Sequence, residues 1–155
     1  MYTIEIKHNI ESAHRFYRAM TSPKCRHIHG HSWVITLTLS APKLNDDGMV
    51  MEFGTLKRRW RHWLDTHLDH ALMLHHRDPM AHAIQSVESE ARLFLFPHDP
   101  TTEHVAEFLM GQARRLILEI EQETLGLNGR GSSIQVAKVH VQETHVNAAS
   151  YVPES

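Results

Sequence analysis

Apolar and polar residues alternate in three stretches of the chain, and this period of two is typical of strands with one buried face. The stretches are YTIEIKHNI (residues 2–10), SWVITLTLS (residues 32–40) and SIQVAKVHVQE (residues 133–143). In the first two, the positions expected to face the core are Tyr2, Ile4, Ile6, Trp33, Ile35, Leu37 and Leu39. The pattern therefore predicts a sheet of at least three strands.

Apolar residues recur at helical spacing in two other segments. The first begins at about Thr55, after the turn-forming residues 42–53, and the second follows Thr101 or Thr102, either of which can cap a helix. Their expected buried positions are Leu56, Trp60, Trp63, Leu64, His67 or Leu68 in the first helix, and Val105, Phe108, Leu109, Leu116 and Ile120 in the second. The glycines of NGRGSS (residues 128–133) are expected to end the second helix. We predict an α+β fold, an antiparallel sheet with two helices packed on one face.

Between the two helices lies a long connection, residues 74–97. Pro79 interrupts it, with room for a helical turn, and RLFLF (residues 92–96) has the composition of a short strand.

Composition changes the picture in three respects. The chain has 155 residues, 41% of them hydrophobic and 22% charged, which is enough for a single domain over residues 1–155. A net charge of −2 gives no reason to expect nucleic acid or a membrane surface as a partner. We expect a cytoplasmic protein, because we find no membrane span or signal peptide, and a single cysteine forms no intrachain disulfide.

Fifteen histidines are unusually many, and three of them share the buried parity of the strands. His14 continues the period of the first strand unless a bulge breaks the count, and His29 and His31 have the parity of Trp33. Three imidazoles with a fourth position open are the ligands of a catalytic zinc site. The alternative is that they are isolated core or surface histidines.

Cys25 has three possible roles: a fourth zinc ligand, a nucleophile or base, or a small buried apolar residue. Lys24 and Arg26 flank it, and their positive charge favours the thiolate that a base or nucleophile needs. Glu143 ends the third strand on its apolar face, where a carboxylate needs a partner.

A position near a helix end is enough to explain three other residues, Asp69, His70 and Glu103. Asp69 and His70 follow the first helix and can interact with its dipole, and Glu103 lies in the first turn of the second helix, where an acid is favourable.

Five motifs in order resemble the 6-pyruvoyl-tetrahydropterin and 6-carboxy-tetrahydropterin synthase family. They are SAHRF (12–16), CRHIHGHSW (25–33) with its C-x-x-x-H-G-H core, LDH (68–70), PTTEHVAEFL (100–109) and VQET (141–144). The resemblance covers nearly the whole chain, and the compact C-x-x-x-H-G-H form looks more like the bacterial 6-carboxy branch of queuosine biosynthesis.

This resemblance implies a role for each candidate residue. His14, His29 and His31 would bind Zn²⁺, Cys25 would be the base, and Asp69 and His70 would complete a proton relay. Glu143 would hold the pterin ring, with Thr101, Thr102 and Glu103 in a pterin-contacting segment. The implied reaction converts 7,8-dihydroneopterin triphosphate to 6-carboxy-tetrahydropterin, with loss of triphosphate and acetaldehyde.

The family also implies an assembly: a tunnelling fold whose sheets join into a barrel, usually a homohexamer made of two trimers, with sites at subunit interfaces. Three alternatives stay open. They are the 6-pyruvoyl product from the same substrate, a structural zinc module with Cys25 as fourth ligand, and a pterin-binding protein without catalysis.

Overall fold

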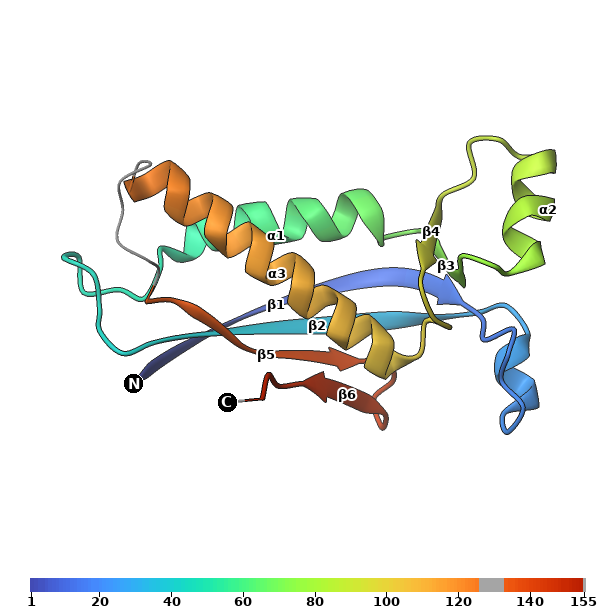
Figure 1. The fold of residues 1–155 in the computed structure, drawn as a ribbon, viewed down its shortest axis with the longest axis horizontal. Coiled ribbons are helices and arrows are strands. Elements are labelled where there is room, and N and C mark those ends of the chain that lie inside the picture. Colours follow the sequence, from blue (N-terminus) through green and yellow to red (C-terminus); the bar gives the residue numbers. More distant parts are fainter. Residues whose placement is uncertain (126–132, 155) are drawn as a thin grey trace.

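Six strands form one sheet in the order β4-β3-β1-β2-β5-β6 in the computed structural model, which describes residues 1–125 and 133–154 (Figure 1). The strands are β1 (Tyr2–His14), β2 (His29–Ala41), β3 (Leu72–His75), β4 (Leu93–Phe96), β5 (Gln135–Gln142) and β6 (Ala148–Tyr151). The helices are α1 (Phe53–His67), α2 (Pro79–Val87) and α3 (Thr102–Leu125), with a short 3₁₀ turn, η1 (Pro23–Arg26). The glycine-rich end predicted for the second helix falls almost entirely on residues 126–132, outside the described residues.

The two long strands pair without a break. β1 and β2 are antiparallel from Tyr2 opposite Ala41 to His14 opposite His29, so no bulge shifts the side-chain parity between them. β5 and β6 extend the sheet antiparallel, with one register shift opposite Thr38 and Leu39. The predicted antiparallel sheet is confirmed for these four strands.

Two short strands on the other side of β1 run parallel. β3 pairs with β1, and β4, expected within residues 92–96, pairs with β3. Each has only four residues, too few to show a period, which is why the sequence pattern did not identify β3.

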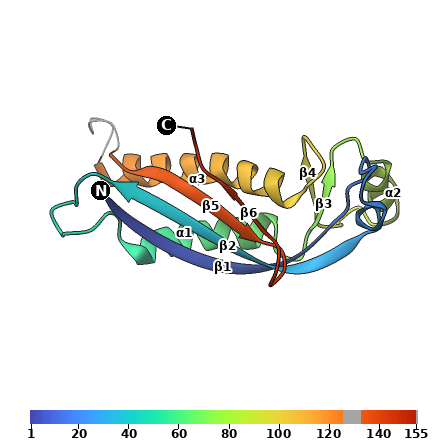
Figure 2. The ribbon, with the colours of Figure 1, turned by 90° about the horizontal axis from the view of Figure 1, so that it is seen from below.

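Helices α1 and α3 lie on the same face of the sheet (Figure 2). Their inward residues and the expected faces of β1 and β2 form one core, in which Trp33, Trp60, Leu37 and Leu109 are at most 1% exposed. Trp63 and Phe108 are only partly buried and pack against its border. The two-helix face is therefore confirmed.

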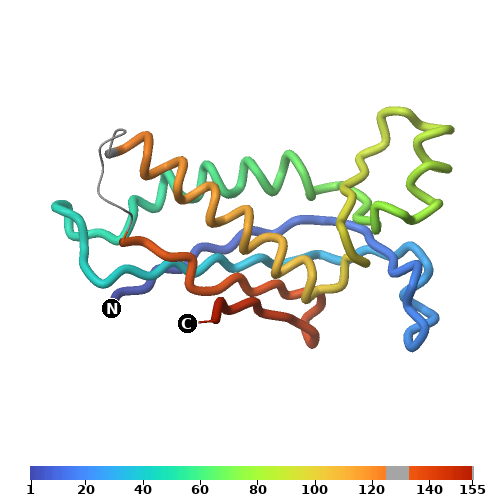
Figure 3. The backbone as a smooth tube through the Cα atoms, viewed as in Figure 1, coloured from blue at the N-terminus to red at the C-terminus, as the bar shows by residue number. Residues whose placement is uncertain are grey.

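The long connection between β3 and β4 contains α2, which begins at Pro79 with Asp78 as its N-cap. Figure 3 shows α2 at the same end of the molecule as the loop that joins β1 to β2. That loop carries Cys25, so α2 and Cys25 lie at the same end of the molecule. Within the described part of the chain, no helix has the length and apolar character that a bilayer span needs.

Candidate functional site

The three histidines converge where β1 ends and β2 begins. His14 is the last residue of β1 and lies opposite His29, while His31 follows two residues later on the same face of β2. Their ring centroids are 4.5 Å (His14 to His29), 5.2 Å (His14 to His31) and 5.1 Å (His29 to His31) apart. One nitrogen from each ring lies within 4.8 Å of the others. The strand register thus brings together the three ligands that the sequence parity predicted.

Hydrogen bonds fix the orientation of two rings. His14 Nδ1 is 2.8 Å from the carbonyl oxygen of Pro100, and His29 Nδ1 is 2.7 Å from that of His27. Because a carbonyl oxygen only accepts, each Nδ1 donates a proton, and the Nε2 lone pair of the neutral ring stays free. A metal ligand needs this tautomer.

The Nε2 atoms of His14 and His31 are buried and have no hydrogen-bond partner. Burial, with a smaller contribution from the neighbouring imidazoles, lowers the pKa of His14 from 6.5 to about 4, against the opposing hydrogen bond to Pro100. Burial also lowers the pKa of His31, although nearby Glu143 opposes the change. At neutral pH both rings are therefore uncharged.

These features fit a transition-metal ion. Three imidazoles converge, the Nε2 atoms of His14 and His31 have no hydrogen-bond partner, and imidazole nitrogen is a preferred ligand of Zn²⁺. Among the described residues, Cys25 is not in this group of close ligand atoms. The geometry therefore favours three protein ligands with an open position over a closed site with Cys25 as the fourth.

Glu143 lies beside the three rings, one residue beyond β5. Its Oε1 is 3.4 Å from His14 Nε2 and 3.6 Å from His31 Nε2, and it accepts a hydrogen bond of 3.1 Å from the Thr102 hydroxyl. The carboxylate that the strand parity marked thus lies within 3.6 Å of two of the three candidate ligands.

Three residues of the segment PTTE (residues 100–103) make hydrogen bonds at or near the site. Pro100 supplies the acceptor for His14, Thr102 donates to Glu143, and Thr101 caps α3, since its side chain accepts from the His104 N–H at 3.3 Å. Glu103 is exposed on the first turn of α3, where the helix dipole accounts for an acid.

Cys25 lies on η1, in the loop between β1 and β2. Its sulfur accepts a hydrogen bond from the Ser22 hydroxyl at 3.0 Å, and its carbonyl accepts one from Phe16 N–H at 2.8 Å. The Phe16 ring in turn packs edge-on against His14, with centroids 4.8 Å apart. Cys25 is partly exposed, and its thiol is free. His27, Lys24 and Arg26 are exposed on the same loop, and His27 serves the site through its carbonyl oxygen.

Asp69 and His70 form the expected pair just after α1. The Asp69 carboxylate accepts from Glu11 N–H and from His70 Nδ1, each at 2.8 Å. Burial alone would raise the pKa of Asp69, but these two hydrogen bonds outweigh it and hold the pKa below its ordinary value. His70 has a left-handed backbone, with φ 56°, and its side chain is 74% exposed.

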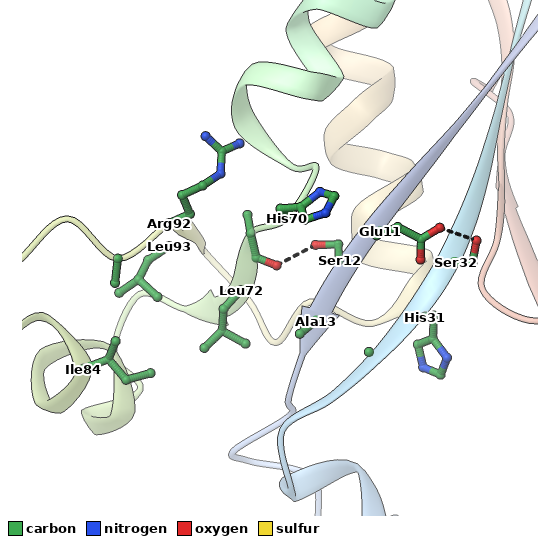
Figure 4. Close-up of a pocket in the computed structure, with 13 residues that line it drawn as sticks. Glu11, Ser12, Ala13, His31, Ser32, His70, Leu72, Ile84, Arg92 and Leu93 are labelled. Atoms are coloured by element: carbon green, nitrogen blue, oxygen red, sulfur yellow. Dashed lines mark hydrogen bonds between the residues drawn. The ribbon is translucent and has the colours of Figure 1, made fainter. Parts of the chain in front are cut away.

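His70 lies on an open groove of about 600 Å³ that one of the three histidines, His31, also lines. Glu11, Ser32 and Arg92 line it too, whereas His14, His29 and Cys25 are not among its lining residues. In Figure 4 the rings of His70 and His31 do not point toward each other. Within a single chain, the structure brings the three histidines together with Glu143 and Thr102, and His70 shares a groove with His31 among the three.

The sequence interpretation missed several supporting groups. Backbone carbonyls at Pro100 and His27 leave no signal in residue identity, although their segments were singled out. Arg92 donates to the carbonyl oxygens of Asp65, Thr66 and Asp69 at 2.8–3.1 Å and so caps the end of α1. A lone arginine in a long connection gave no sign of this contact.

Comparison with known proteins agrees with this geometry. The family model described as 6-pyruvoyl tetrahydropterin synthase matches residues 3–154. A 6-carboxy-5,6,7,8-tetrahydropterin synthase of Rickettsia bellii is 33% identical over 91 residues, 57% of this chain and 64% of the relative, so the match spans less than two thirds of that protein. The enzyme of the same name from Aquifex aeolicus is 30% identical over 134 residues, 84% of this chain and 77% of its own.

A solved structure shows the same fold. The 6-pyruvoyl tetrahydropterin synthase of Caenorhabditis elegans has a TM-score of 0.66 at 20% identity, over 99% of this chain and 96% of that one. With the family match over nearly its full length, the chain belongs to the 6-pyruvoyl tetrahydropterin synthase family.

Proposed function

We propose that the protein is a zinc-dependent lyase that converts 7,8-dihydroneopterin triphosphate to 6-carboxy-5,6,7,8-tetrahydropterin, with loss of triphosphate and acetaldehyde. The observation that carries this proposal is the convergence of three imidazoles, two of whose Nε2 atoms have no hydrogen-bond partner, beside the carboxylate of Glu143. Relatives named 6-carboxy-5,6,7,8-tetrahydropterin synthase support that branch, and we propose queuosine biosynthesis as the pathway.

His14, His29 and His31 would hold the ion. When bound, Zn²⁺ supplies Lewis acidity toward the hydroxyls of the substrate side chain. Cys25 is the proposed base that removes the neighbouring C–H proton, because it is a free thiol on the loop that joins His14 to His29, and this loop carries the exposed cations Lys24 and Arg26.

Glu143 is the proposed pterin anchor. A carboxylate accepts two hydrogen bonds from the guanidine-like edge of a pterin, and Thr102 holds Oε1 of this carboxylate at the site. Thr101 and Glu103 complete the segment proposed to contact the pterin.

Asp69 and His70 are proposed to finish the proton relay. Asp69 binds His70 Nδ1, so that the imidazole presents its Nε2 to the outside. Because the His70 side chain is 74% exposed and shares its groove with His31 but not with His14 or His29, the proposal includes an oligomer in which one subunit's relay meets another's metal centre. We propose the homohexamer of two trimers. We also place the protein in the cytoplasm, which the free thiol of Cys25 favours.

The test is to incubate zinc-loaded protein with 7,8-dihydroneopterin triphosphate and to identify the pterin product by mass. A 6-carboxy product together with acetaldehyde, absent in Cys25→Ala, would support the proposal. A 6-pyruvoyl product would keep the site and move the protein to the other branch. Bound zinc without turnover would leave a structural zinc module or a pterin-binding protein, and substrate affinity would separate these two.

A further inference from the structure

The turn that carries Cys25 has no hydrophobic anchor. None of the residues of η1 (Pro23–Arg26) is buried, so burial of apolar surface cannot hold the thiol in place. The contacts that tie this turn to the rest of the fold are polar. Phe16 N–H donates to the Cys25 carbonyl at 2.8 Å, and Arg15 Nη1 donates to the Arg26 carbonyl at 3.4 Å.

Arg15 is itself held by Asp78. Its Nε donates to Oδ2 at 2.7 Å and its Nη2 to Oδ1 at 2.5 Å, a two-point ion pair. Asp78 is only 2% exposed, and its Oδ1 also caps α2 through Met80 N–H at 2.8 Å. A buried carboxylate keeps its partner strongly, because losing that partner would leave an unpaired charge out of water.

The position of this pair gives it a role beyond folding. Arg15 follows the metal ligand His14 directly and precedes Phe16, whose N–H binds the Cys25 carbonyl. A rigid arginine fork thus connects α2, in the long connection, with the end of β1 and the Cys25 turn.

We propose that Arg15 and Asp78 are positioning residues for Cys25: their ion pair fixes the turn that presents the thiol to the substrate. The predicted effect of this ion pair on turnover rests on the proposed function. Its predicted effect on the order of the turn follows from the contacts alone.

Asp78→Asn is the sharpest variant. Asparagine has nearly the same shape and caps helices as well as aspartate does, so α2 keeps its N-cap while the ion pair loses its charge. Glu123→Gln is the matched control, since it weakens an exposed ion pair with Arg59, whose Nη1 is 2.7 Å from the Glu123 carboxylate. If Asp78→Asn does not fold at the assay temperature, Arg15→Lys replaces it, because lysine keeps the charge but cannot form the fork.

Two measurements are compared between variant and control. We expect kcat for the pterin substrate to fall about 10- to 100-fold in Asp78→Asn, as for other groups that orient reacting residues, with KM nearly unchanged. We also expect iodoacetamide to alkylate Cys25, the single cysteine, faster than in the wild type, because the loosened turn exposes the thiol. Glu123→Gln should leave both values at the wild-type level.

The second measurement needs neither zinc nor substrate, so it separates this inference from the proposed function. If the wild type has no turnover, the proposed function fails, and the alkylation rates still decide the role of the ion pair. An unchanged alkylation rate in Asp78→Asn overturns the inference, whether kcat falls or not, since the ion pair then does not order the turn. Faster alkylation with wild-type kcat also overturns it, because the order of the turn then has no bearing on catalysis.

Discussion

Protonation of His14 should destabilise the metal-free fold in mild acid. The His14 ring is fully buried and its pKa is lowered to about 4, so the folded state binds this proton less readily than the unfolded state, where the pKa is 6.5. Above pH 6.5 both states are neutral at this position, and its contribution to stability is complete. As the pH falls from 6.5 toward 4, only the unfolded state gains the proton, and stability is lost.

The size of the effect follows from the two pKa values. The interval from 6.5 to about 4, at about 1.4 kcal/mol for each unit, gives a total loss of about 3 kcal/mol. Between pH 7 and pH 5 the free energy of unfolding should fall by about 2 kcal/mol through His14 alone.

Urea unfolding of the protein in EDTA, followed by tryptophan fluorescence at pH 7 and pH 5, measures this loss. With a typical dependence on urea, the midpoint should move by about 1 M. His14→Asn keeps an N–H donor for the Pro100 carbonyl but removes the titration, so its midpoint should move about 1 M less than that of the wild type. His62→Asn, at an exposed histidine of α1, should behave as the wild type. If His14→Asn loses as much stability as the wild type between the two pH values, the reasoning is wrong.

Three further results are expected. Zinc at about 100 times its Kd should stabilise the protein by about 2.7 kcal/mol, seen as a higher Tm with an unchanged far-UV spectrum, and His31→Ala should abolish the shift. Glu143→Gln should raise KM for the pterin substrate about 10- to 100-fold, since it removes a charge-assisted hydrogen bond, and an unchanged KM would exclude Glu143 as the anchor. His70→Gly should stop turnover but raise the free energy of unfolding by about 1 kcal/mol, because glycine adopts φ 56° without strain. The control, His70→Ala, should stop turnover without raising the free energy of unfolding.

The convergence of the three histidines was predictable because strand parity is a local rule. Once β1 and β2 are known to pair, alternate residues share a face, and His14, His29 and His31 fall beside Trp33 and Ile10. The same rule placed Glu143 on the apolar face of its strand. The two-helix layer followed from helical spacing in the same way.

Contacts between segments distant in the sequence were not predictable by these rules. Arg15 and Asp78 are separated by β2, α1 and β3, and neither residue lies in a periodic pattern that indicates the other. The orientation of Asp69 and His70 depends on how the end of α1 meets Glu11, which is a property of the packed fold. Short β3, with four residues, also gains its structure from pairing with its neighbours.

The burial that makes His14 sensitive to acid also prepares it to bind a metal. A histidine with a pKa of about 4 is neutral throughout the neutral range, so an ion would not have to displace a proton from it. The hydrogen bond to Pro100 holds the proton on Nδ1, and the buried Nε2 has no hydrogen-bond partner of its own. Metal binding would satisfy that nitrogen. Because the folded His14 takes up a proton only near pH 4, this ring should not weaken zinc binding by the folded protein between pH 6.5 and pH 4, the range in which the metal-free fold loses stability.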